Sequence, residues 1–121
     1  MTNDRNVMTL TLNDYQADTA STAIYKWPII YPALGLANEA GEVIGKIKKL
    51  IRDQEIAFDG TTKLTQSQRE SIASELGDVL WYVAALARDI DYSLNDVAIQ
   101  NLWKLEDRKA RNKIGGSGDN R

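Results

Sequence analysis

The sequence contains neither cysteine nor histidine among its 121 residues. Without cysteine the chain forms no disulfides and has no thiol chemistry. Without either residue type, the usual zinc sites, Ser-His and Cys-His catalysis and histidine-ligated iron are excluded. Any catalytic site must therefore be built from carboxylates, amides, hydroxyls, lysine, arginine and tyrosine.

The chain also lacks an excess of charge of one sign and lacks long hydrophobic runs. Its 15 basic and 17 acidic residues give a net charge of −2. Proteins that bind long nucleic acids or membrane surfaces usually carry a basic excess or a polybasic run, and neither is present. No apolar run is long enough to span a bilayer, and no signal peptide is recognisable. These features predict a single soluble, cytoplasmic domain with a modest core.

Strand-type alternation is missing, and the apolar residues recur at helical spacing instead. Asn13, Ser67 and Ser93 have the chemistry and position of helix N-caps, and Pro28 and Pro32 break the chain between the first two helices. The first helix has few apolar positions, so we expect it to be peripheral. The predicted helices are at about 14–26, 32–52, 68–90 and 94–112, which makes the fold class all-α with a four-helix bundle.

The third predicted helix is apolar most of the way round, because Leu80, Trp81 and Ala84 lie outside its main apolar stripe. A short chain has few other helices to cover such a surface, so we predict a homo-oligomer. On the fourth helix we expect Leu94, Ala98, Leu102 and Leu105 to pack inward. We assign residues 1–112 to one domain and expect the glycine-rich tail, residues 113–121, to be disordered.

Two acidic tetrads, Glu39-Ala40-Gly41-Glu42 and Glu75-Leu76-Gly77-Asp78, lie within the second and third predicted helices. Residues three apart are neighbours on one helix face, so each tetrad offers two carboxylates that point the same way. If the two helices form an antiparallel hairpin, Glu42 and Glu75 lie roughly 15 and 11 Å from the turn, at nearly the same level. The sequence therefore predicts one cluster of four carboxylates.

Clustered carboxylates at the edge of a core repel one another and lose hydration, and a hard divalent cation removes this penalty. Mg²⁺ takes oxygen ligands, and Mn²⁺ accepts the same set. The simpler reading is solvated helix charge, with Glu42 and Lys46 forming an ordinary salt bridge four residues apart. Two facing acidic pairs favour the metal site over this reading.

Other polar and aromatic side chains have two readings each. Asn101, Lys104 and Arg108 share one edge of the fourth helix, where they are either a polar rim or a grip for phosphate groups. Tyr82 is either a tyrosine at the core edge or a hydroxyl directed at a metal ligand or substrate. Trp27, in the proline-containing connector, is the best candidate for stacking on a base, although tryptophans are more often packing residues.

Three segments together resemble the MazG-like nucleoside triphosphate pyrophosphohydrolases, an all-α superfamily that includes dimeric dUTPases and dCTP pyrophosphatases. The resemblance covers about residues 12–112 and is specific when the blocks occur together in this order. The segments are Gly35-Leu36-Ala37-Asn38-Glu39-Ala40-Gly41-Glu42-Val43, Glu75-Leu76-Gly77-Asp78-Val79-Leu80-Trp81-Tyr82 and Asn101-Leu102-Trp103-Lys104-Leu105-Glu106-Asp107-Arg108.

The resemblance implies cleavage of a nucleoside triphosphate to the monophosphate and pyrophosphate, in nucleotide-pool house-cleaning, by a homodimer or homotetramer. It implies that Mg²⁺ is held by Glu39, Glu42, Glu75 and Asp78. It also implies substrate contacts from Tyr82, Asn101, Lys104 and Arg108, to which Lys46 and Trp27 are added. Glu42 is our candidate for the proton acceptor.

Two other functions are compatible with the helical pattern. A non-enzymatic interaction module would carry its acids as solvated surface charge and use its aromatic face for docking. A carboxylate-bridged di-iron bundle is disfavoured because such sites normally include histidine. Titration with Mg²⁺ or Mn²⁺ separates the enzyme from the interaction module.

Overall fold

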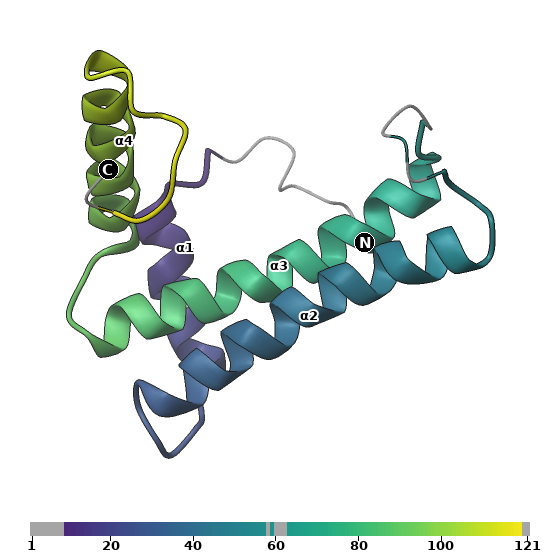
Figure 1. Cartoon of the computed structure of the whole chain (residues 1–121). Helices are drawn as coiled ribbons and strands as arrows, with labels where there is room; N and C mark the ends of the chain where they lie inside the picture. Colours follow the sequence, from purple (N-terminus) through teal and green to yellow (C-terminus); the bar gives the residue numbers. More distant parts are fainter. Residues whose placement is uncertain (1–8, 58, 60–62, 120–121) are drawn as a thin grey trace.

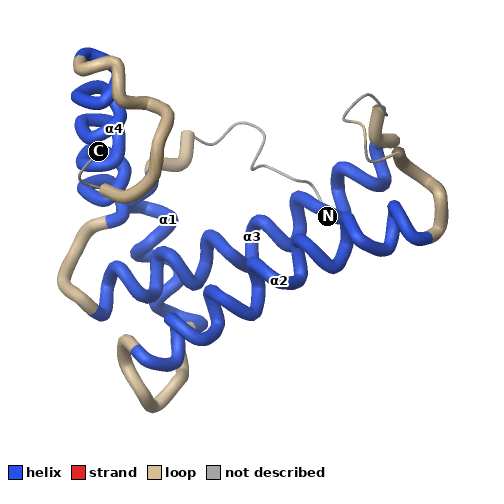
Figure 2. Tube along the Cα trace, in the orientation of Figure 1, coloured by secondary structure: helices blue, strands red, loops and turns tan. Residues whose placement is uncertain are grey.

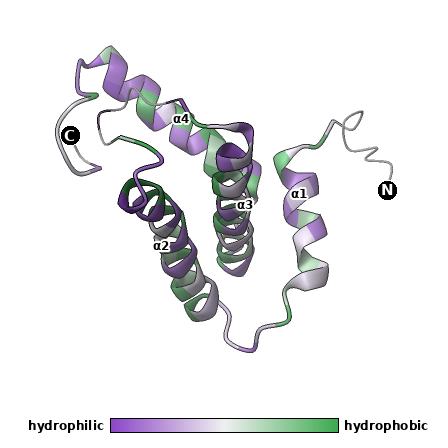
Figure 3. Cartoon of the chain, turned by 90° about the vertical axis from the view of Figure 1, so that its right-hand side faces the viewer, coloured by the Kyte–Doolittle hydropathy of each residue, from purple (hydrophilic) through white to green (hydrophobic). Residues whose placement is uncertain are grey.

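The computed structural model describes residues 9–57, 59 and 63–119, and these residues form helices with no strand among them (Figures 1 and 2). The prediction of an all-α fold with four main helices is confirmed. α2 and α3 form a long antiparallel hairpin, α3 lies between α2 and α1, and α4 stands at the end of α3 (Figures 1 and 3). The elements are α1 (Leu12–Thr19), the 3₁₀-helix η2 (Ala20–Thr22), α2 (Ile30–Arg52), α3 (Gln66–Asp89) and α4 (Leu94–Ala110).

The start of α3 differs from the predicted start because its cap is Thr65 and not Ser67. The Thr65 hydroxyl accepts a hydrogen bond from the Gln68 backbone N–H at 3.2 Å, and the Gln68 side chain accepts one from the Thr65 N–H at 2.8 Å. This reciprocal pair is a capping box. The capping-box pattern occurs twice in this stretch, once from Thr65 and once from Ser67, and we chose the wrong one.

α1 is shorter than predicted, and most of its residues are exposed, as expected of a peripheral helix. The Thr11 hydroxyl accepts from the Asp14 N–H at 3.0 Å and caps the helix, so the assignment of this role to Asn13 was wrong. Gln16 and Thr19 are both buried. Arg88 of α3 donates to the Gln16 carbonyl at 2.8 Å and to the Thr19 hydroxyl. α1 is thus held on α3 by polar contacts, which a search for apolar stripes does not detect.

Three side chains satisfy the first backbone donors of α4. The Gln16 amide oxygen accepts from the Leu94 N–H at 2.9 Å, and Asn13 accepts from the Asn95 N–H at 3.0 Å. Ser93, the predicted cap, accepts from the N–H three residues further on, also at 3.0 Å. Because the first N–H groups of a helix have no partner within the helix, these bonds fix α4 against α1.

Three helices end without the glycine that usually terminates a helix. Gln54, Asp91 and Asn112 follow α2, α3 and α4, and each has a positive φ, between 57 and 63°. In each case two backbone hydrogen bonds close the end, as where the Gln54 N–H donates to the Ile51 carbonyl at 3.1 Å. This is the Schellman motif, in which a residue in the left-handed conformation lets the following N–H groups bond to the last carbonyls of the helix.

Much of the apolar surface of the four helices is exposed. On α4, Leu94 is buried, but Leu102 is 60% and Leu105 39% exposed, so the prediction that these two pack inward is wrong. On α3, Leu76 and Leu80 are also exposed. Hydrophobic and hydrophilic segments alternate along α2, α3 and α4 (Figure 3). The core of the single chain is small, and its buried apolar members are Ala84, Ala85, Ala87, Leu94 and Pro32.

The tail can be followed as far as Asp119, and its predicted disorder stays a prediction. It leaves the end of α4 and runs back beside that helix (Figure 1). Asp119 of the tail forms ion pairs with Lys104 and Arg108. The last two residues, 120–121, lie outside the described part of the chain. Within the described residues, none of the helices combines the length and apolar character that crossing a membrane requires.

Candidate active site

Three carboxylates from two helices converge near the middle of the α2–α3 hairpin. Glu39 comes from α2, and Glu75 and Asp78 come from α3. One oxygen of each lies within 4.8 Å of the others, with Glu39 and Glu75 half-buried and Asp78 exposed. Glu75 and Asp78 are three apart on one face, and the antiparallel pairing of α2 with α3 brings Glu39 opposite them. The structure therefore brings together three of the four acids that we singled out.

Glu42, the fourth acid, is exposed and is not part of this three-carboxylate group. It remains close enough to act on Glu39 through space. The pKa of Glu39 is raised above its usual value by partial desolvation first, and then by the negative charges of Asp78, Glu75 and Glu42. Three oxygen donors that repel one another at a half-buried site are a donor set that fits a hard divalent cation.

Lys46 does not pair with Glu42 as the spacing on α2 suggests. Its ammonium lies 3.8 Å from the Glu75 carboxylate of the neighbouring helix. This ion pair spans the hairpin on the side of the cluster nearer the α2–α3 connection. It compensates part of the negative charge at Glu75, whereas Glu39 and Asp78 line a pocket.

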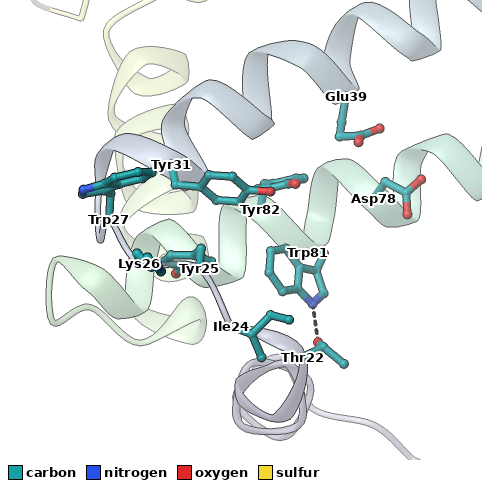
Figure 4. Close-up of a pocket in the computed structure, with 10 residues that line it drawn as sticks. All are labelled: Thr22, Ile24, Tyr25, Lys26, Trp27, Tyr31, Glu39, Asp78, Trp81 and Tyr82. Atoms are coloured by element: carbon teal, nitrogen blue, oxygen red, sulfur yellow. Dashed lines mark hydrogen bonds between the residues drawn. The ribbon is translucent and has the colours of Figure 1, made fainter.

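A pocket of about 620 Å³ opens beside Glu39 and Asp78. Figure 4 shows these two carboxylates at one end and the Trp27 indole at the other, with aromatic rings between them. The pocket is formed by α2, α3 and the connector between η2 and α2. Its lining residues are Thr22, Ile24, Tyr25, Lys26, Trp27, Tyr31, Glu39, Asp78, Trp81 and Tyr82.

The aromatic residues of the pocket form one contiguous group. Tyr25 stacks on Tyr31 with 5.1 Å between ring centroids, and Trp81 meets Tyr82 edge to face at 5.0 Å. The Tyr31 and Tyr82 rings are 6.2 Å apart and join the two pairs. Trp27, by contrast, is 68% exposed and leaves its ring faces open to a ligand. Of these pocket residues, Trp27 and Tyr82 are candidates from the sequence, whereas Tyr25, Tyr31 and Trp81 have no sequence signal that marks them.

Tyr82 reaches the pocket because Gly35 of α2 has no side chain. A Cβ at residue 35 would collide with the Tyr82 ring. Tyr82 therefore lines the pocket, and the pKa of its hydroxyl is raised by the hydrogen bond with Tyr31, by burial and by the charges of Tyr31, Glu39 and Asp78. It is a neutral hydroxyl near the acids, able to donate a hydrogen bond.

Asp89, at the end of α3, holds the connector that carries Trp27. Its carboxylate accepts from the Tyr25 hydroxyl and from the Ile29 N–H, both at 2.9 Å. Ile29 has φ 70° and ψ −61°, and the N–H of Ile30 donates to the Pro28 carbonyl at 2.8 Å. This is a γ-turn, an unusual conformation for a β-branched residue, and Asp89 stabilises it. No spacing pattern in the sequence points to Asp89.

The cationic edge of α4 does not reach the acids within this chain. Asn101 and Lys104 line a separate hollow beside Ile90 and Tyr92. Lys104 and Arg108 are paired with Asp119 of the tail. α4 packs against α1 and α3 at the far end of the hairpin from its turn (Figure 1). The predicted phosphate grip and the carboxylate cluster are therefore two separate sites in the single chain.

Divalent cations are expected to raise the melting temperature, and to do so more at pH 8 than at pH 5. Because the Glu39 pKa is raised, the stability that this group contributes is present at low pH and is lost as pH rises through that pKa. A cation binds the ionised cluster and restores the lost stability. At a Mn²⁺ concentration about ten times its Kd, we expect a rise of about 3–6 °C at pH 8.

Thermal unfolding followed by circular dichroism measures this shift. Glu70→Gln, an exposed acid earlier on α3, is the matched control and should keep the shift. Glu39→Gln should abolish it. An equal Mn²⁺ shift at pH 5 and pH 8, or one that survives Glu39→Gln, would place the bound metal elsewhere.

Comparisons with known proteins found one family model and a relative that match the chain. The family model described as "MazG nucleotide pyrophosphohydrolase domain" matches residues 32–112, which include all four acids and the cationic edge of α4. The chain is 44% identical over 115 residues to the Gene 37 protein of Mycobacterium phage L5, an alignment that covers 88% of this chain and 96% of that protein. No solved structure matched the chain.

Proposed function

This chain belongs to the MazG nucleotide pyrophosphohydrolase domain family, and on that premise we propose that it is a Mg²⁺-dependent enzyme that hydrolyses nucleoside triphosphates to the monophosphate and pyrophosphate. The observation that carries the proposal is the convergence of Glu39, Glu75 and Asp78 at one end of an aromatic pocket. A polyphosphate with its metal fits the acidic end, and a base fits the aromatic end. We place the enzyme in the cytoplasm, where it would remove unwanted nucleotides from the pool.

Glu39, Glu75 and Asp78 are the residues that would hold Mg²⁺ or Mn²⁺, with Glu42 as a fourth acid at the exposed side. A bound divalent ion supplies a water of lowered pKa and neutralises charge on the phosphates. The half-buried position of Glu39 and Glu75 excludes part of the bulk water, which strengthens every electrostatic interaction at the cluster. These residues fix the site on two packed helices and not on a loop.

The remaining residues are assigned to substrate and to proton transfer. Glu42 is exposed beside Glu39 and would accept the proton of the attacking water. Trp27 would stack on the base, since its ring is exposed at the far end of the pocket. The Tyr82 hydroxyl, between these two ends, would donate to the sugar or the first phosphate, and Lys46 would contact the outer phosphates beside Glu75.

We further propose that residues 1–112 act as one domain and that copies of the chain associate as a dimer or tetramer. The support is the exposure of large apolar side chains on three helices, among them Ile44 at 67%, Leu76 at 52% and Trp103 at 69%. A stable single chain rarely leaves so many large apolar side chains in water. Association would also allow Asn101, Lys104 and Arg108 of one copy to approach the acids of another.

The function is tested with a panel of canonical and damaged ribo- and deoxyribonucleoside triphosphates in the presence of Mg²⁺. We expect equimolar monophosphate and pyrophosphate, with ¹⁸O from labelled water appearing in the monophosphate because water attacks the α-phosphorus. EDTA should stop the reaction. Release of inorganic phosphate with the diphosphate would assign a different reaction, and absence of turnover with every nucleotide would favour the non-enzymatic interaction module. Light scattering on the same sample gives the oligomeric mass.

A further inference from the structure

The end of the chain folds back onto α4 through a series of left-handed residues. Asn112, directly after the helix, has φ 57°, and the Lys113 N–H donates to the Arg108 carbonyl at 2.6 Å. Gly116 and Gly118 have φ values of 94° and 83°, which only glycine adopts readily. The two glycines let the short tail reverse direction and run beside the helix it has just left (Figure 1).

The reversal places the Asp119 carboxylate against both cations of α4. Its Oδ1 accepts from Lys104 Nζ at 3.2 Å and from an Arg108 terminal nitrogen at 3.0 Å, and the Asp119 carbonyl accepts from the same nitrogen at 3.2 Å. Arg108 is only 5% exposed, whereas every other residue from 101 to 110 is exposed. The Arg108 side chain is therefore buried in this contact and is not a solvated surface charge.

The pairing leaves Arg108 incompletely satisfied. Its Nε is buried and has no hydrogen-bond acceptor in the described part of the chain. The guanidinium presents its donors as a rigid fork that matches two oxygens of one anion, and Asp119 engages only a terminal nitrogen. A phosphoryl group has three oxygens and more negative charge, so it can bind the open edge of the fork and Lys104 together.

We propose that Lys104 and Arg108 form an anion site whose resident ligand is the chain's own Asp119, and that a polyphosphate binds there by displacing the tail. The tail is thus an internal competitor. This proposal rests on the proposed function in one respect, because we take the displacing anion to be the polyphosphate of the nucleotide. A competitor attached to the same chain through a short segment acts at a high effective concentration. Because an exposed carboxylate binds weakly, we expect the tail to weaken polyphosphate binding about three- to tenfold.

The test measures binding of tripolyphosphate to the full chain by calorimetry, without metal and at low ionic strength. Asp119→Asn removes the competing charge and should lower the Kd about three- to tenfold. The matched control is Asp107→Asn, which makes the same change of charge on α4, where Asp107 pairs with Arg111 in solvent. If Asp119→Asn and Asp107→Asn shift the Kd equally, the effect is one of net charge and the proposal is overturned.

A second pair of variants checks the site itself. Lys104→Met and Arg108→Met should each raise the Kd for tripolyphosphate at least tenfold in the Asp119→Asn background. Tripolyphosphate binding that is undetectable in Asp119→Asn, or that is indifferent to loss of both cations, overturns the proposal. These readouts need no turnover. If the enzyme is active but Asp119→Asn does not change the Kd, only the proposal about the tail is overturned. If the protein is inactive but Asp119→Asn lowers the Kd, only the proposed function is overturned.

Discussion

Replacement of Glu39 by glutamine is expected to lower kcat/KM for nucleoside triphosphate hydrolysis by about 10³-fold or more while the helical fold is retained. Glu39 is the only member of the three-carboxylate group that comes from α2, so its loss leaves both remaining ligands on α3. The amide of glutamine keeps the shape of the side chain and removes the charge that a divalent cation requires. Because desolvation first, and then repulsion within the cluster, raises the pKa of Glu39, the charge is unfavourable there without metal, and the metal-free variant should be no less stable than the parent.

Steady-state release of pyrophosphate measures the loss, and circular dichroism verifies the fold. Glu75→Gln and Asp78→Asn should behave like Glu39→Gln. Glu70→Gln, which changes an exposed acid on the same helix as Glu75, should leave kcat/KM within about twofold. Near-normal turnover in all three cluster variants would show that hydrolysis occurs at another site.

Glu42→Gln then separates a ligand from a proton acceptor. A proton acceptor can be removed without loss of metal binding, so turnover should fall while the rise in melting temperature with Mn²⁺ remains. If Glu42 were a metal ligand, both would fall together. The exposed position of Glu42, outside the three-carboxylate group, favours the first result.

Three members of the carboxylate cluster, Glu39, Glu75 and Asp78, could be anticipated from helix geometry, whereas Glu42, which the same geometry places with them, lies outside the group. Spacing of three within each tetrad fixes the face, and the rise per residue fixes the level on two antiparallel helices. The same reasoning failed for Lys46, which pairs with Glu75 across the hairpin and not with Glu42 on its own helix. Two side chains four apart can meet, but a better partner on a packed neighbour decides which contact forms.

The aromatic pocket and the cationic edge could not be placed from the sequence, for a different reason. Tyr25 and Trp27 lie on a connector whose path depends on a strained turn at Ile29 and on its bonds with Asp89. The position of Lys104 depends on how the chain turns between α3 and α4. Such turns are set by single hydrogen bonds between residues distant in sequence, and no periodic pattern records them.

The helix ends were predicted to within about two residues except in α1, where polar residues outweigh the apolar pattern. The sparse apolar positions between Asp14 and Lys26 predict a long, peripheral helix. In the structure the α-helix ends at Thr19, where Arg88 donates to the Gln16 backbone carbonyl and to the Thr19 hydroxyl. Hydrophobic periodicity does not predict which polar residues are buried, because their burial depends on hydrogen-bond partners elsewhere in the fold.

Gln16 is expected to make the largest single contribution of any polar side chain to the stability of the chain. Its amide donates to the Ala84 carbonyl at 3.2 Å and to the Tyr92 carbonyl at 3.0 Å, and accepts from the Leu94 N–H at 2.9 Å. These three bonds join α1, α3 and the start of α4. Gln16→Leu loses all of them and leaves the Leu94 N–H buried without its acceptor, so we expect a loss of about 3 kcal/mol.

For a chain of this length that loss corresponds to a fall in melting temperature of about 10 °C. The matched control is Gln100→Leu, an exposed glutamine of α4, which should change the melting temperature by no more than about 2 °C. Hydrogen exchange should localise the Gln16→Leu effect, with protection lost in α1 and the first turn of α4 while the α2–α3 hairpin keeps its own. Uniform loss of protection along all four helices would instead show that the Gln16 amide stabilises the hairpin and the carboxylate cluster as one cooperative unit with α1 and α4.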